Sequence, residues 1–184
     1  AKVANDTNAA AYGQNAKAMQ QGTVAVGAYS NATRQYAIAI GSESNASNDT
    51  ALAVGRDANA SGEFTISIGA NSIALANGAQ ALGTQANASG NNSIAYGQHA
   101  DAKGIQAISI GNESKANGLI SIAIGSFAFS NGDKAIAIGQ SSRGQGASSV
   151  AIGRLALSSD QSTIAVGNDA NATSNRAVAV GASA

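Results

Sequence analysis

The sequence contains no cysteine, no proline and no tryptophan, and only 4% of its 184 residues are aromatic. Without cysteine, no disulfide can stabilise the fold, and cysteine usage cannot indicate a redox compartment. Charged residues are also scarce, at 11%, and ten basic and ten acidic side chains cancel to a net charge of zero. A neutral chain has neither the electrostatic footprint of a nucleic-acid-binding protein nor a polybasic membrane patch. No apolar run approaches the roughly 18 residues needed to span a bilayer, so we expect no direct membrane insertion.

Glycine is abundant instead, with 22 residues, and most of it is periodic. Each periodic glycine follows a segment close to apolar-Ala-apolar, as in residues 38–41 (Ile-Ala-Ile-Gly). A fixed period of this length is typical of solenoid proteins, in which each repeat forms one coil that stacks on the next. A glycine recurs every fourteen residues without exception, and we call this set the anchor glycines: Gly13, Gly27, Gly41, Gly55, Gly69, Gly83, Gly97, Gly111, Gly125, Gly139, Gly153, Gly167 and Gly181.

A period of fourteen residues is also two heptads, so a helical coiled coil has to be compared with a β-solenoid. The apolar residues of the repeat lie two positions apart and most are β-branched, whereas a coiled-coil seam requires spacings of three and four. Glycine at every anchor would also cost a helix about 1 kcal/mol each. The repeat therefore predicts an all-β, single-domain solenoid of about thirteen 14-residue coils over residues 1–184.

Small residues alternate regularly in both halves of each repeat. Two and four residues before the anchor glycine the side chain is almost always Ala, Ser or Thr, as at Ala37 and Ala39. The third residue after the glycine is always Ala or Ser, and the fifth is Ala in most repeats, as at Ala46. Alternation with a period of two is typical of strands, here with one face small. Two such faces can pack closely, which predicts a thin, flat roll with turns at the anchor glycine and at a later Gly/Asn/Asp cluster.

Large apolar residues occupy the positions one and three before the anchor glycine. At 24 of these 26 positions the residue is Val, Ile, Leu or Tyr, and the exceptions are Ala10 and Gln80. If small residues fill the roll, the large ones point outward, and each would forfeit about 1.5–3 kcal/mol in water unless another chain covers it. In the opposite arrangement the large residues would fill the roll, but the strand after the glycine offers no large side chains to pack against them. We therefore predict a homotrimer whose interface includes Val26, Ile40, Ile68, Gln80, Ile110, Ile124, Ile138 and Ile152.

Residues 92–97 (Asn-Ser-Ile-Ala-Tyr-Gly) and 148–153 (Ser-Ser-Val-Ala-Ile-Gly) resemble the Asn-Ser-Val-Ala-Ile-Gly repeats of YadA-type heads in bacterial trimeric autotransporter adhesins. The resemblance extends over the whole chain. It implies a left-handed parallel β-roll, three chains side by side, and extracellular display at the bacterial surface on a stalk and an outer-membrane anchor. General crossover geometry favours the right hand, so the left hand rests on the resemblance alone. The chain begins and ends within a repeat, and we expect a fragment of a longer fibrous surface protein that lacks its stalk and anchor.

The resemblance also implies a function. It indicates a non-catalytic adhesin that binds host extracellular-matrix proteins such as collagen, fibronectin or laminin, or that holds neighbouring bacterial cells together. A structural spacer in the same kind of fibre, with no ligand of its own, is the alternative. An ice-binding face of regular threonines is disfavoured, because the outward positions mix Asn, Lys, Arg, Glu and Phe.

The titratable residues do not indicate an active site. The only histidine, His99, lies two positions after an anchor glycine, with Gln85 and Glu113 at the same place in the neighbouring repeats, and we expect a surface role for it. Glu43 and Asp57 share this column, but no pocket makes them a catalytic pair. We expect no enzyme activity, no cofactor and no metal site.

Several apolar residues stand where the repeat pattern requires polar ones. Phe127 and Phe129 occupy the second and fourth positions after an anchor glycine, and Leu155 and Leu157 occupy the same positions two repeats later. We predict these four as a candidate ligand patch, because aromatic and aliphatic anchors dominate interface energies. Packing against a neighbouring chain or domain is the alternative for them. Packing against a neighbouring chain is also the expected role of three apolar residues in the second turn of their repeats, at the Gly/Asn/Asp cluster: Ile105, Leu119 and Ile120.

Overall fold

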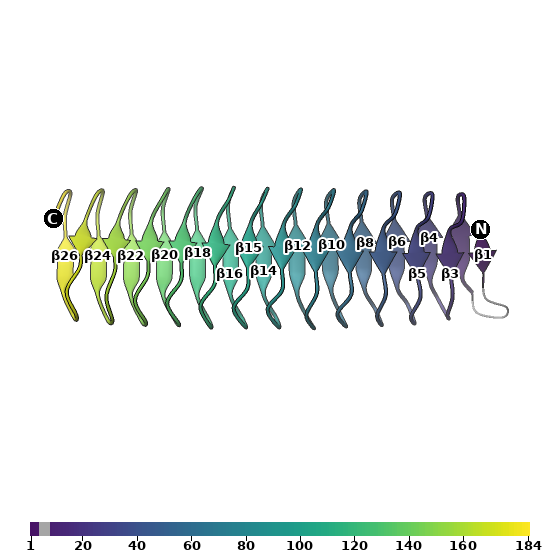
Figure 1. The fold of residues 1–184 in the computed structure, drawn as a ribbon, viewed down its shortest axis with the longest axis horizontal. Helices are drawn as coiled ribbons and strands as arrows, with labels where there is room; N and C mark the ends of the chain where they lie inside the picture. Colours follow the sequence, from purple (N-terminus) through teal and green to yellow (C-terminus); the bar gives the residue numbers. More distant parts are fainter. Residues whose placement is uncertain (4–7) are drawn as a thin grey trace. The chain divides into compact units, whose positions relative to one another are not determined.

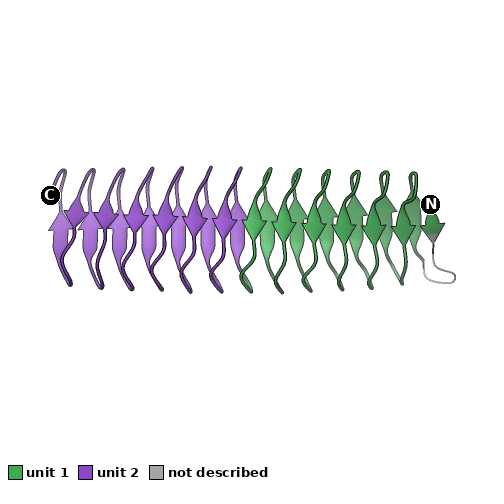
Figure 2. Ribbon diagram, viewed as in Figure 1, with its two compact units in different colours: residues 1–92 green, residues 93–184 purple. Residues whose placement is uncertain are grey.

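The computed structural model describes residues 1–3 and 8–184, and every regular element in those residues is a β-strand. The strands fall into two compact units, residues 1–92 and residues 93–184 (Figure 2). In each unit the chain winds through stacked coils of about fourteen residues, each with two short strands (Figure 1). This confirms the predicted all-β parallel solenoid of about thirteen coils. The described segments hold no helix with the length and apolarity that crossing a membrane requires.

Unit 1 contains two parallel arrays built from alternate strands. Neighbouring strands pair at an offset of fourteen residues, as Ile38 does with Leu52, and only β1 departs from this, because Lys2 pairs with Lys17. The strands that precede the anchor glycines are β2 (Ala10–Tyr12), β4 (Val24–Val26), β6 (Ile38–Ile40), β8 (Leu52–Val54), β10 (Ile66–Ile68) and β12 (Gln80–Leu82). The others are β1 (Lys2–Val3), β3 (Lys17–Ala18), β5 (Asn31–Ala32), β7 (Asn45–Ala46), β9 (Asn59–Ala60), β11 (Ile73–Ala74) and β13 (Asn87–Ala88).

Unit 2 repeats this arrangement with the same offset, as Phe129 pairs with Arg143. The strands before the anchor glycines are β14 (Ile94–Tyr96), β16 (Ile108–Ile110), β18 (Ile122–Ile124), β20 (Ile136–Ile138), β22 (Val150–Ile152), β24 (Ile164–Val166) and β26 (Val178–Val180). The others are β15 (Asp101–Ala102), β17 (Lys115–Ala116), β19 (Phe129–Ser130), β21 (Arg143–Gly144), β23 (Leu157–Ser158) and β25 (Asn171–Ala172). Because the offset is constant, equivalent residues of successive coils within a unit lie in columns.

The anchor glycine turns the chain between the two strands of a coil. At Gly27 the backbone φ is +130°, a conformation that residues with a side chain rarely adopt. A Cβ atom on Gly27 would also lie 2.5 Å from the carbonyl oxygen of Gly41 in the next coil. Both the backbone conformation and the close approach of the coils therefore require glycine. Two residues after the glycine the chain is left-handed with an ordinary side chain, as at Glu43, where φ is 60°.

The interior of each unit consists of small side chains. Ala37, Ala39 and Ala46 are fully buried, and the largest fully buried side chains are threonines such as Thr65. The Thr65 hydroxyl donates a hydrogen bond to the carbonyl oxygen of Gly62 at 2.7 Å, so its polar group is satisfied inside the roll. This confirms the predicted interior of Ala, Ser and Thr and excludes the opposite arrangement. The left hand of the roll stays a prediction.

Candidate functional site

The even-numbered strands of both units carry an apolar outer face. The residues one and three before each anchor glycine project there, and their side chains are half-buried or exposed, as at Ile40, which is 39% exposed. A continuous apolar face of this kind is typical of a surface that another chain covers. Each of the eight predicted interface residues lies on the apolar outer face of its own unit: Val26, Ile40, Ile68 and Gln80 in unit 1, and Ile110, Ile124, Ile138 and Ile152 in unit 2.

The four residues of the predicted ligand patch belong to unit 2 and to the odd-numbered strands or the turns before them. Phe129 is half-buried in β19, and Phe127 is 49% exposed in the preceding turn, where its φ is 58°. A left-handed backbone is unfavourable for a bulky side chain, and asparagine or aspartate would suit this turn better. Two coils later, Leu155 is likewise a bulky side chain on a left-handed backbone, with a φ of 60° and 43% of it exposed. Leu157 is half-buried in β23.

Arg143 divides this patch into an aromatic pair and an aliphatic pair. Its strand pairs with that of Phe129 on one side and with that of Leu157 on the other. A shallow hollow adjoins the aromatic pair, and its lining residues are Glu113, Lys115, Phe127, Ala128, Phe129, Arg143 and Gln145. The sequence reasoning missed the two cations of this hollow. A signal for them existed, because Lys115, Phe129 and Arg143 all stand four residues after an anchor glycine.

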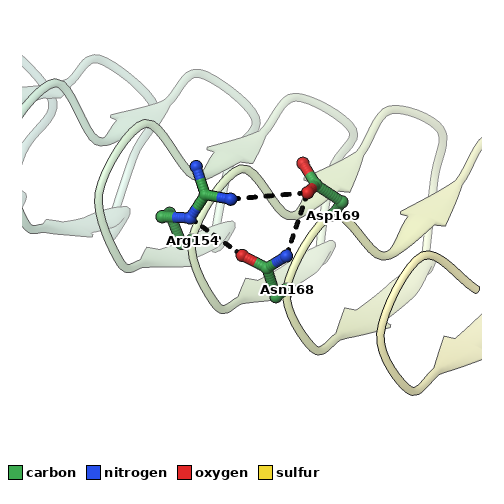
Figure 3. A network of polar contacts seen from close by, with 3 residues as sticks. All are labelled: Arg154, Asn168 and Asp169. Carbon is green, nitrogen blue, oxygen red and sulfur yellow. Dashed lines mark hydrogen bonds and ion pairs between the residues drawn. The ribbon is translucent and has the colours of Figure 1, made fainter.

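The charged groups beside the aliphatic pair satisfy one another (Figure 3). Arg154 Nε donates to Asn168 Oδ1 at 2.9 Å, and Asn168 Nδ2 donates to Asp169 Oδ2 at 2.9 Å. Arg154 Nη2 also lies 3.6 Å from Asp169 Oδ2. The ion pair of this triangle is about half exposed, so it contributes no more than about 1 kcal/mol to stability. The triangle links two adjacent coils and already has a structural explanation.

Further apolar side chains are exposed in the late turns. Ile105, Leu119 and Ile120 are all exposed, and the Ile120 backbone N–H donates to the Ile105 carbonyl at 2.9 Å, which places the two turns side by side. Ile120 has a φ of 55°, which is unusual for a β-branched residue. Packing of these residues between subunits stays a prediction. The sequence reasoning missed Phe64, which is 64% exposed at the turn position in unit 1 equivalent to that of Ile120.

The titratable residues singled out from the sequence lie in surface turns, with Glu43 and Asp57 in adjacent coils of unit 1 and His99 in unit 2. His99 is exposed in a turn of unit 2. Asp57 forms an ion pair with Arg56, at 3.5 Å between Arg56 Nε and Asp57 Oδ2, rather than acting with Glu43. A metal site would require a cluster of at least three His, Asp or Glu side chains, and residues 1–3 and 8–184 contain no such cluster. The arrangement offers surfaces for noncovalent binding.

Comparison with known proteins identifies the repeat. The family model described as the YadA head domain repeat (two copies) matches residues 20–44, 46–72, 74–100, 102–128, 121–142, 130–156 and 158–184. Among solved structures, the collagen-binding domain of the Yersinia adhesin YadA is similar at 22% sequence identity and a TM-score of 0.33, over 94% of this chain and 69% of that one. No curated protein matches the chain significantly. Because the family model covers most of the sequence, this chain belongs to the YadA head-repeat family of adhesin heads.

Proposed function

We propose that this chain is the adhesive head of a homotrimeric bacterial surface fibre and that it binds host extracellular-matrix proteins or neighbouring cells without catalysis. The observation that carries this proposal is the apolar outer face of the even-numbered strands. The face repeats in every coil from β4 onward, with Gln80 as its single polar member at these positions. A soluble monomer would have no reason to keep such a face in water.

The energetics favour covering this face with copies of the same chain. A side chain such as Ile40 or Ile138, which is about one third exposed, would gain on the order of 0.5–1 kcal/mol from complete burial. Two such side chains per coil, over a dozen coils, add up to a substantial driving force. Three chains around a three-fold axis can each turn this face toward the axis, and the closed symmetry leaves no copy of it uncovered.

The odd-numbered strands would then face outward and be available to a ligand. Weak contacts repeated along the coils, and three times around the trimer, would combine through high effective concentration when the ligand is long. Collagen, fibronectin and laminin are ligands of this kind, and the similar Yersinia domain is described as collagen-binding. Display outside the cell would require a stalk and an outer-membrane anchor supplied by other parts of a longer protein.

A structural spacer is the second candidate, and one observation favours it. In unit 1 the outward residues of β5, β7 and β9 are asparagines that bond to one another. Asn31 Nδ2 donates to Asn45 Oδ1, and Asn45 Nδ2 donates to Asn59 Oδ1, both at 3.1 Å. A ladder of this kind uses its polar groups on itself and leaves few for a ligand. Unit 1 is therefore the better candidate for a spacer, and unit 2 for adhesion.

Solid-phase binding of the purified protein to collagen, fibronectin and laminin tests the adhesive role. The decisive variant is the double substitution Phe127→Ser, Phe129→Asn. Both new residues already occur at these positions in other coils, as Ser141 and Asn45, so the roll should tolerate them. We expect the variant to keep its oligomeric state and thermal stability and to lose most of its avidity for the bound matrix protein.

Phe64→Ser is the matched control for this variant. It removes an exposed aromatic residue from a left-handed turn of unit 1, as Phe127→Ser does in unit 2, and it should leave matrix binding unchanged. If the parent binds none of the three proteins, adhesion to these matrix proteins is excluded, and the spacer function becomes the leading candidate. If the double variant binds with parental avidity, the aromatic pair is not the adhesive site.

A further inference from the structure

Two cations flank the aromatic pair of unit 2, and neither forms an ion pair within the residues that the structure describes. Lys115 in β17 and Arg143 in β21 are exposed, and both strands pair directly with β19, which carries Phe129. Three of the other cations do form ion pairs, as Lys103 does with Asp101 at 2.8 Å between Lys103 Nζ and Asp101 Oδ2. In the described part of the chain, Lys115 and Arg143 lie within 4.0 Å of no carboxylate oxygen.

The spacing of these groups is set by the sheet. Adjacent parallel strands lie about 4.8 Å apart, so the backbones of Lys115 and Arg143 are separated by about 10 Å with Phe129 halfway between them. Phe127 lies two residues before Phe129, and both residues line the same hollow. Glu113 and Gln145 complete its rim with a carboxylate and an amide. The hollow thus presents two apolar ring surfaces, two cations and two hydrogen-bonding groups.

This set of groups matches a sugar ring that carries an anionic substituent. The faces of the phenylalanine rings are electron-rich, and they can contact the apolar C–H face of a pyranose. The Arg143 guanidinium suits a sulfate or carboxylate through paired hydrogen bonds, and Lys115 provides a second point charge. Glu113 and Gln145 can bond to sugar hydroxyls. The geometry points to a binding site for an acidic saccharide, a sulfated or carboxylated glycan, at the hollow between Lys115 and Arg143.

The same features make a peptide ligand a poorer fit. An extended peptide binds by adding a strand to an open sheet edge, but β17, β19 and β21 are each paired on both sides within unit 2. A peptide side chain used as an anchor needs a deep, enclosed pocket, whereas this hollow is shallow and open. A flat ring that lies on the phenylalanines needs neither. The site deepens the proposed adhesive role and rests on it, because it assigns a ligand class to the same aromatic pair.

Titration of the full chain with defined oligosaccharides tests this site. The probes are a heparin-derived hexasaccharide, its desulfated counterpart and a peptide that combines glutamates with tyrosine. We expect binding of the sulfated sugar that weakens as the salt concentration rises, and much weaker binding of the other two. Lys115→Gln and Arg143→Gln should each weaken binding about tenfold, because each removes one charge-assisted contact.

Phe129→Asn separates a built site from general attraction between a polyanion and surface cations. It keeps both cations, and asparagine already stands at the equivalent position of β7. We expect it also to weaken sugar binding about tenfold, because the ring contact is lost. The matched controls Lys134→Gln and Arg34→Gln remove exposed cations elsewhere and should change the affinity less than twofold.

Unchanged sugar affinity in Phe129→Asn, equal losses in the controls, or tighter binding of the peptide would each overturn the saccharide site. Its failure is distinguishable from failure of the adhesive role. A chain that binds collagen, fibronectin or laminin but no sugar keeps the adhesive role and loses this site. A chain that binds the sugar through these residues but none of the three proteins keeps this site and shows that its ligand is a glycan.

Discussion

The two units carry different chemistry at the same position of the same coil. Four residues after the anchor glycine, unit 1 has a ladder of three asparagines, whose amides are joined by hydrogen bonds of 3.1 Å: Asn31, Asn45 and Asn59. At this position three successive coils of unit 2 hold a cation, an aromatic ring and a second cation: Lys115, Phe129 and Arg143. The residues that follow them are small and fully buried in both units.

The comparison shows which side chains the roll itself requires. It needs glycine at the turn and small residues inside, and it accepts almost any outward side chain on the odd-numbered strands. The asparagine ladder joins three coils through its side-chain hydrogen bonds and so has a structural role. At the same position, unit 2 has a half-buried ring between two exposed cations that form no ion pair among the described residues, and such groups are better explained by a binding partner than by stability.

The largest expected effect comes from the face that both units share, on the even-numbered strands. Ile124→Asp should prevent assembly, because three carboxylates would be buried against one another around the axis. Asn171→Asp, which adds the same charge to an exposed odd-numbered strand, should assemble like the parent. Light scattering after size-exclusion chromatography measures both masses. An Ile124→Asp protein with the parental mass would show that this face is not the interface.

Enlarging an inner residue should affect both units alike. Ala46 in unit 1 and Ala116 in unit 2 are fully buried at the same position of their coils. Replacing either with leucine should destabilise the protein by about 3 kcal/mol or more, because the thin interior has no room for the added carbons. Denaturant unfolding measures the change. If either variant unfolds like the parent, the small-residue interior is not essential to that unit.

A smaller difference in stability should distinguish the asparagine ladder of unit 1 from the column of Lys115, Phe129 and Arg143 in unit 2. Asn45→Ala removes two side-chain hydrogen bonds and should lower the free energy of unfolding by about 1 kcal/mol. Phe129→Asn should change it by less than about 0.5 kcal/mol, because Phe129 lies outside the small-residue interior and asparagine already stands at this position of β7. Thermal unfolding of the two variants side by side provides the measurement. A larger loss in Phe129→Asn would assign the ring a structural role and weaken the contrast between the units.

Much of the fold could be predicted from the sequence, because its main determinants are local and periodic. The anchor glycines mark every first turn, and the alternation around Ala37 and Ala39 correctly assigns the small side chains to the interior. The strand after the glycine is shorter than the alternation implies. Phe127, two residues after its glycine, lies in a left-handed turn rather than in β19.

The candidate site was only partly predictable. Phe127 and Phe129 stood out because they break a polar pattern, whereas Lys115 and Arg143 obey it and were passed over. The fixed period places the two cations on either side of Phe129. That they lack acidic partners depends on where long, exposed side chains point, and periodicity carries no information about this. The asparagine ladder was missed for the same reason, since the sequence places its members but does not orient their amides.

The trimer is the central claim of this account, and sedimentation equilibrium of the purified chain at micromolar concentration tests it most directly. The method reports the mass of the assembly without assuming its shape. We predict a single species of about three times the 17.9 kDa of one chain, because only assembly covers the isoleucine and valine face of the even-numbered strands. A stable monomer of 17.9 kDa at that concentration would contradict the account.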